Sequence, residues 1–104
     1  MSGAYEESEY VFCDLQEVYR YLRKYSRATA EAFLEAAYDT FEFLAENPGL
    51  GRPRSEFGHE GLRSWRVEGF RKHLIFYREL PGKIQIWRVL HGTRDLQRIL
   101  GTTG

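Results

Sequence analysis

Residues 70–96 read FRKHLIFYRELPGKIQIWRVLHGTRDL, and this segment carries the clearest strand pattern in the chain. Large apolar residues follow one another from 74 to 77, a run that is typical of a strand covered on both faces. Pro81 and Gly82 then fit the two middle positions of a type II turn. Apolar residues resume in alternation from 83 to 91. The stretch therefore predicts a β-hairpin, and its six Arg and Lys residues add cations at regular intervals.

One more strand is predicted directly before this hairpin. Residues 62–68 alternate in character, because Trp65 and Val67 fall on one side while Ser64, Arg66 and Glu68 fall on the other. Together with the hairpin, this segment predicts a three-strand meander over about residues 62–91. The preceding stretch NPGLGRPRSEFGHEG is rich in Gly, Pro and Ser and is predicted to be a loop.

The first part of the chain has the period of helices. Apolar residues from Val11 to Leu22 recur on one helical face, and Ser8 or Asp14 is a candidate cap, with Glu17 completing an acidic capping box. The segment EYVFC is also rich in strand formers, so we expect a strand somewhere in residues 3–12.

A second helix follows after only a few residues. Its apolar positions run from Ala30 to Ala45, and Ser26 or Thr29 is the expected cap. The sequence Asn-Pro-Gly at 47–49 should end it, with Gly49 in the left-handed conformation. An antiparallel helical hairpin over about residues 8–47 is therefore expected.

The fold class predicted from these elements is α+β. We expect the N-terminal antiparallel helical hairpin to pack on one face of a small antiparallel β-sheet, in a single domain over residues 1–104 with a short C-terminal segment at 92–104. The opposite sheet face would then stay available to partners. Arg78 and Arg88, which interrupt apolar strands, are expected to project from that face.

Composition limits the classes of function. The 104 residues suit one domain, the single Cys13 cannot form an intramolecular disulfide, and no long apolar run occurs. The start MSGAYEESE lacks the features of a signal peptide, so we expect a reducing, cytoplasmic location and no membrane partner. Residues 1–50 hold four basic and ten acidic residues, whereas residues 51–104 hold eleven basic and five acidic residues. This asymmetry indicates a basic working face beside an acidic helical layer, or two halves that attract each other on folding.

Cofactor chemistry finds little support in the sequence. His59, His73 and His91 are far apart, and with one cysteine they do not form a zinc motif, so neither a metal nor another cofactor is expected. Nucleotide-binding and serine-hydrolase motifs do not occur. His91 at a strand end is expected to hydrogen-bond a neighbouring carbonyl, and Asp95 to cap the helical turn DLQRIL.

The chain resembles the ParE toxins of bacterial type II toxin–antitoxin modules, within the RelE/ParE superfamily. The resemblance covers residues 8 to 100 and rests on DLQEVYRYL, NPGLGRPR, LRSWRVEGFRKHLIFYRE and IQIWRVLHGTRDL. It implies helices against an antiparallel sheet, a ParD-like antitoxin that binds the toxin directly in a hetero-oligomeric complex, and DNA gyrase as the poisoned target. It implies no sequence-specific binding of nucleic acid by the toxin alone.

Relatives of RelE type instead cut mRNA on the ribosome, using lysines, arginines and a tyrosine. Alignment of the strands places Ser64 and Arg66 at the lysine positions, His73 and Arg94 at arginine positions, and Leu100 where the tyrosine should be. Arg66, His73 and Arg94 are therefore the candidate residues if the chain is a ribosome-dependent endoribonuclease. A toxin-fold interaction domain that has lost its target is the other alternative.

Binding has more support than catalysis in the residue types present. Arginine pairs with carboxylates through a planar fork of donors, which suits an acidic antitoxin segment. The residues predicted to bind antitoxin or target are Arg66, Arg71, Arg78, Trp87, Arg88, His91 and Arg94.

Overall fold

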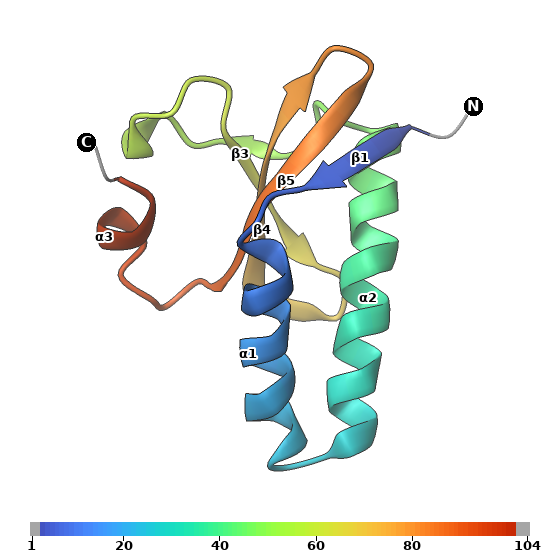
Figure 1. Ribbon diagram of the computed structural model, residues 1–104. Helices are drawn as coiled ribbons and strands as arrows, with labels where there is room; N and C mark the ends of the chain where they lie inside the picture. The colour runs from blue at the N-terminus through green and yellow to red at the C-terminus, as the bar shows by residue number, and fades with distance from the viewer. Residues whose placement is uncertain (1–2, 102–104) are drawn as a thin grey trace.

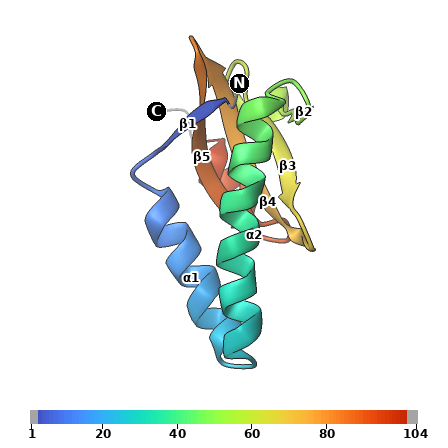
Figure 2. The same ribbon diagram turned by 90° about the vertical axis from the view of Figure 1, so that its right-hand side faces the viewer.

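Two helices lie against one face of a five-stranded sheet in the computed structural model, which describes residues 3–101 (Figures 1 and 2). The α+β class predicted from the sequence is therefore confirmed. In sheet order the strands run β1, β5, β4, β3 and β2. The elements are β1 (Ala4–Glu7), α1 (Val11–Arg23), α2 (Arg27–Glu46), β2 (Arg52–Pro53), the 3-10 turn η1 (Ser55–Phe57), β3 (Arg63–Val67), β4 (Phe70–Leu80), β5 (Lys83–His91) and α3 (Leu96–Leu100).

The predicted meander is present as β3, β4 and β5, with antiparallel pairing throughout. Leu80 pairs with Lys83 across the hairpin, and Gly82 has a φ of 75°, which the second middle position of a type II turn requires. The β4–β5 register shifts between Phe76 and Tyr77, and this irregularity lies opposite Trp87 and Arg88.

The first strand lies within the predicted range, but its direction differs from the expectation. β1 pairs with β5 in parallel, from Ala4 opposite Lys83 to Glu7 opposite Ile86, so the sheet is mixed rather than wholly antiparallel. The two strands are separated by most of the chain, and a local apolar pattern carries no information on the direction of such a pairing. β2 is a short strand within the segment that was predicted to be a loop.

The start of α1 corrects the predicted cap. Tyr10 occupies the N-cap position without a side-chain hydrogen bond, and the Ser8 carbonyl accepts the Val11 amide at 3.3 Å. The Ser8 hydroxyl instead donates to the Trp87 carbonyl of β5 at 2.6 Å. Asp14 lies inside the helix, and its carboxylate also bonds to β5, so the prediction that Asp14 caps α1 with Glu17 is wrong.

The limits of α2 largely follow the sequence. The Ser26 hydroxyl accepts the Thr29 amide at 3.1 Å, which confirms Ser26 as the cap. The helix ends at Glu46 with Asn47 as its C-cap, as the Asn-Pro-Gly sequence predicted. The left-handed conformation expected of Gly49 is not found, and the amide of the C-cap residue Asn47 bonds to the Phe43 and Leu44 carbonyls.

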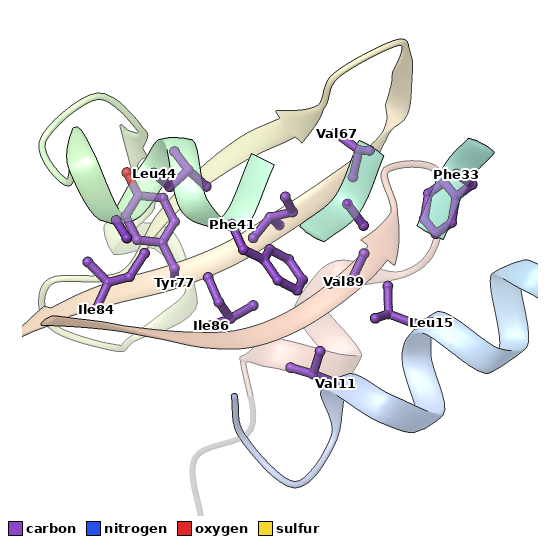
Figure 3. Close-up of a cluster of buried hydrophobic side chains, with 13 residues drawn as sticks. Val11, Leu15, Phe33, Phe41, Leu44, Val67, Tyr77, Ile84, Ile86 and Val89 are labelled. Carbon is purple, nitrogen blue, oxygen red and sulfur yellow. The ribbon is translucent and has the colours of Figure 1, made fainter. Parts of the chain in front are cut away.

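The main core fills the space between the helices and the sheet. Figure 3 shows side chains from α1, α2 and the strands directed toward one another. The i, i+3, i+4 spacing of the helices places their apolar residues on one face, and the alternation of the strands does the same for the sheet. The buried residues drawn and labelled are Val11, Leu15, Phe33, Phe41, Leu44, Val67, Tyr77, Ile84, Ile86 and Val89.

A second apolar cluster covers part of the opposite sheet face. Phe76 and Leu90 contribute from the strands, Phe57 and Leu62 from the segment around η1, and Leu100 from α3. The expectation that this face stays open to partners is therefore wrong over the area that these residues cover. The cause is the continuous apolar run in β4, which requires burial on both faces.

Candidate functional site

A cleft of about 450 Å³ lies between α1 and the segment formed by the ends of β4 and β5 and the loop that follows β5. It brings together His73, His91 and Arg94, which the sequence had singled out separately. The remaining lining residues are Asp14, Glu17, Val18 and Tyr21 of α1, Val89 and Leu90 of β5, and Thr93.

The two histidines of the cleft are neighbours across the sheet. His73 pairs with His91 in the β4–β5 register, and the ring centroids are 5.0 Å apart. The His73 ring also packs against Phe33 of α2, with centroids 5.1 Å apart. His73 Nδ1 is buried and has no hydrogen-bond partner. Burial, and secondly the proximity of His91, lowers the pKa of His73 to about 4, so this ring is neutral at physiological pH.

The tautomer of His91 follows from its contacts. The Thr93 amide donates to His91 Nδ1 at 3.1 Å, and the Thr93 hydroxyl lies 2.6 Å from the same nitrogen. Because Nδ1 accepts the amide proton, the neutral ring must carry its own proton on Nε2. The predicted hydrogen bond of His91 to a neighbouring carbonyl is not found among the described residues. Its partners are the amide and the hydroxyl of Thr93 instead.

Arg94 and Glu17 form an ion pair across the cleft. Arg94 Nη1 donates to Glu17 Oε1 at 2.9 Å, and the side chains are 45% and 66% exposed. Exposed ion pairs of this kind contribute only about 0–1 kcal/mol to stability. The pair therefore links α1 to the loop after β5 without fixing either segment firmly.

Arg88 forms a second ion pair with α1, in a much more enclosed setting. Its Nε and Nη2 donate to the Asp14 carboxylate at 2.8 and 2.9 Å, and the two side chains are 19% and 7% exposed. Asp14 Oδ2 also accepts the Val89 amide at 3.0 Å, beyond the end of β1 where the β5 edge would otherwise be unpaired. Hydrogen bonding to Asp14 raises the pKa of Arg88. The expectation that Arg88 projects from the outer sheet face is wrong, because its guanidinium bonds to Asp14 of α1.

The remaining predicted binding residues lie outside the cleft. Arg66 stacks on the Trp65 ring at 4.7 Å and lines a hollow of about 380 Å³ with Asp39, Thr40 and Phe43 of α2. Arg71 is exposed at the start of β4.

Arg78 and Trp87 lie beside each other on the outer face of the sheet, as predicted for Arg78. They line a hollow of about 180 Å³ with His59, Leu62 and Gln85, and Arg78 Nε donates to Gln85 Oε1 at 3.1 Å.

The three residues of the nuclease alternative do not form one site. His73 and Arg94 line the cleft, but Arg66 does not. In the β3–β4 register Arg66 pairs with Leu74, the neighbour of His73, and successive side chains of a strand point to opposite faces. The cation that lines the cleft is Arg94, which Glu17 already holds. Arg71 and Lys72 line another hollow together with His73.

Sequence reasoning did not identify the α1 wall of the cleft. Asp14 and Glu17 bond to residues more than 70 positions away, and Tyr21 lines the same wall. No local pattern indicates such contacts. One signal was available for Asp14, since it falls on the apolar helical face of Val11, Leu15 and Val18. An acid at such a position requires a cationic or amide partner.

Within residues 3–101 the structure has neither a metal-binding cluster nor a membrane-spanning helix. No group of three or more His, Cys, Asp or Glu residues is placed to hold a metal ion in that part of the chain. Over the same residues, none of the helices has the length and apolar character needed to cross a membrane.

The His73 environment predicts an acid-sensitive stability. The unfolded chain takes up the His73 proton near pH 6.5, whereas the folded chain does so only near pH 4, so stability falls as the pH drops from 6.5 toward 4. We expect His73→Phe to remove about 1 kcal/mol of this loss at pH 5, with solvent screening of the half-buried ring taken into account.

Urea unfolding of the His73→Phe variant and the wild type at pH 7.5 and pH 5 measures this difference. Equal acid-induced losses in both proteins would contradict the assignment of the effect to His73.

Comparison with known proteins gives consistent matches. The profile of the family described as the ParE toxin of the type II toxin–antitoxin system, parDE, matches residues 8–96. Toxin ParE1 of Caulobacter vibrioides is 29% identical over 103 residues, which cover 93% of this chain and 97% of that protein. The solved structure described as the chromosomal ParDE TA system from P. aeruginosa has a similar fold, with a TM-score of 0.71, 20% identity, and coverage of 86% of this chain and 96% of that chain.

Proposed function

Because this chain belongs to the ParE toxin family of type II toxin–antitoxin systems, we propose that it arrests growth by poisoning DNA gyrase and is neutralised by a ParD-like antitoxin that binds it directly. The observation that carries the proposal is the family match over residues 8–96, which includes both helices and the strands β3 to β5. Both partners would meet the toxin in the bacterial cytoplasm, and the proposal involves no membrane and no cofactor.

The surface supports binding of a protein segment that carries both apolar and acidic groups. The cleft offers Tyr21 and Val18 beside Arg94 and His91, and the outer sheet face offers Trp87 beside Arg78. Arg66 and Arg71 are further exposed cations. Arginines next to apolar surface suit acidic side chains on an amphipathic peptide.

The cleft gives little support to RNA cleavage. Attack by a ribose hydroxyl needs a base together with cations around the phosphate. His73 is neutral at physiological pH, but Arg66 lines another hollow and the carboxylates of Asp14 and Glu17 line the cleft. Binding without catalysis is therefore the better interpretation of this arrangement.

A DNA supercoiling assay tests the gyrase proposal. Purified gyrase with the toxin freed from its antitoxin is expected to lose supercoiling activity and to accumulate cleaved DNA. Antitoxin added in excess should restore supercoiling, because the bound toxin can no longer reach its target. A toxin inactivated by prior heating serves as the control for non-specific effects.

Two outcomes would contradict the gyrase proposal. Full supercoiling in the presence of folded toxin that binds its antitoxin would exclude gyrase, and translation-dependent mRNA cleavage would then indicate the ribosomal alternative. Normal growth of cells that express the toxin without antitoxin would indicate an interaction domain that has lost its target.

A further inference from the structure

The structure points to a regulated docking site for the antitoxin in the cleft beside α1. We infer that Glu17 is an intramolecular competitor, which occupies Arg94 until a carboxylate on an apolar antitoxin segment takes its place. The inference rests on the proposed antitoxin partnership and adds the site, the anchoring group and the contact that must be exchanged.

The apolar part of the cleft suits a side chain of a docked peptide. Val18 and Tyr21 line it from α1, and Val89 and Leu90 line it from β5. Tyr21 is 57% exposed, and its ring packs edge-on against Tyr25 with centroids 5.6 Å apart. A large exposed aromatic surface of this kind, beside a hollow, is typical of a protein interaction site rather than of a free surface.

Hydrogen-bond donors also line the same cleft. Arg94 has five N–H donors, and one of them bonds to Glu17. His91 carries its proton on Nε2, because Nδ1 accepts the Thr93 amide. Two donors of different residues, next to apolar surface, can bind one carboxylate of an incoming segment.

The charges of the cleft favour a peptide over a nucleic acid. Asp14 and Glu17 both line it, so a polyphosphate chain would bring many negative charges close to two carboxylates. A single carboxylate from a peptide replaces Glu17 at Arg94 one for one. The displaced Glu17 is exposed and can be hydrated at once.

The two carboxylates of α1 differ in how readily they can be exchanged. Asp14 is 7% exposed and bonds to both Arg88 and the Val89 amide, so its removal from Arg88 would disrupt the β5 edge. Glu17 lies one turn further along the helix and holds Arg94 through a single bond. The helix thus presents one structural ion pair and, beside it, one ion pair that is weak enough to exchange.

The test is a comparison of antitoxin affinity for four full-length toxins: wild type, Glu17→Gln, Arg94→Ala and the double variant. The probe is a purified ParD-like antitoxin, and calorimetry gives the dissociation constants. We expect Arg94→Ala to weaken binding about tenfold, because it removes the anchor. Glu17→Gln should tighten binding about threefold, because it removes the competitor. In the Arg94→Ala background, Glu17→Gln should have no effect, since nothing is left to compete for.

Controls separate the exchange from general electrostatics. Glu9→Gln removes a negative charge from an exposed residue just before α1 that has no ion pair among the described residues, and it should leave the affinity unchanged. Circular dichroism should show native folding in all variants, because Glu17 and Arg94 are exposed.

Several results would overturn the inference while antitoxin binding itself stands. One is an antitoxin affinity of Glu17→Gln that is equal to or weaker than that of the wild type. Another is a gain in affinity from Glu17→Gln that is just as large in the Arg94→Ala background. A third is an equal gain in affinity from the control substitution Glu9→Gln. If Glu17→Gln raised the affinity for single-stranded RNA but not for the antitoxin, the cleft would be assigned to nucleic acid instead. Wild-type toxin that does not bind the antitoxin at all would overturn the proposed partnership.

Discussion

Replacing Asp14 with alanine is expected to lower the free energy of unfolding by about 3 kcal/mol, the largest effect of any substitution considered for this protein. The carboxylate bonds twice to Arg88 and once to the Val89 amide. Its removal leaves a mostly buried guanidinium without its counter-ion and a buried amide without an acceptor. Both groups then bear desolvation costs, and the contact of the guanidinium with the Tyr10 ring, at 4.7 Å, offsets only part of them.

Urea denaturation at pH 7.5 measures this loss, and the other α1 carboxylate provides the matched control. Glu17→Ala removes an exposed ion pair from the same helix and should change stability by no more than about 0.5 kcal/mol. The double variant Asp14→Leu with Arg88→Met should recover much of the stability, because an apolar pair leaves no uncompensated charge. A loss for Asp14→Ala as small as that for Glu17→Ala would show that the enclosed pair contributes little.

The second large effect is expected for Tyr77→Phe, with a loss of about 2 to 3 kcal/mol. The Tyr77 ring is fully buried in the main core, where its burial raises the hydroxyl pKa (Figure 3). The hydroxyl donates to the Pro48 carbonyl at 2.8 Å and accepts the Gly51 amide at 2.8 Å. Phenylalanine retains the packing but leaves both backbone groups without this partner, so the loss reports the hydrogen bonds alone.

Tyr38→Phe is the matched control for this substitution. Tyr38 also packs on the core, edge-on against Phe41 with centroids 5.5 Å apart, but none of the described residues hydrogen-bonds its hydroxyl. Its loss should stay within about 0.5 kcal/mol. Thermal or chemical unfolding of both variants gives the comparison, and equal losses would exclude a special role for the Tyr77 hydroxyl.

The contact with Tyr77 also explains why residue 51 is a glycine, which the sequence pattern indicates only as a loop residue. A Cβ built on Gly51 would overlap the Tyr77 hydroxyl oxygen, at a separation that real Cβ atoms do not adopt. Glycine at 51 is therefore required by the close approach of the chain to the tyrosine, not by its backbone angles.

The elements that depend on local periodicity could be predicted from the sequence alone. The 3.6-residue period of α1 and α2, the Ser26 cap and the end of α2 at Asn47 could all be predicted. The strands β3 to β5 and the type II turn at Pro81 and Gly82 could be predicted as well. These features follow from backbone geometry and from which side of an element is apolar, and neighbouring residues carry that information.

The contacts between residues distant in sequence became known from the three-dimensional structure. The parallel pairing of β1 with β5, the Asp14–Arg88 pair and the Glu17–Arg94 pair join the two ends of the chain. Each depends on how the helical hairpin docks on the sheet, and docking is fixed by the shape of the whole core rather than by any residue's neighbours in sequence. A charged residue in the sequence has the same appearance whether it is exposed, paired or exchangeable. Its burial and its partner, which distinguish Asp14 from Glu17, exist only once the core has brought α1 against β5.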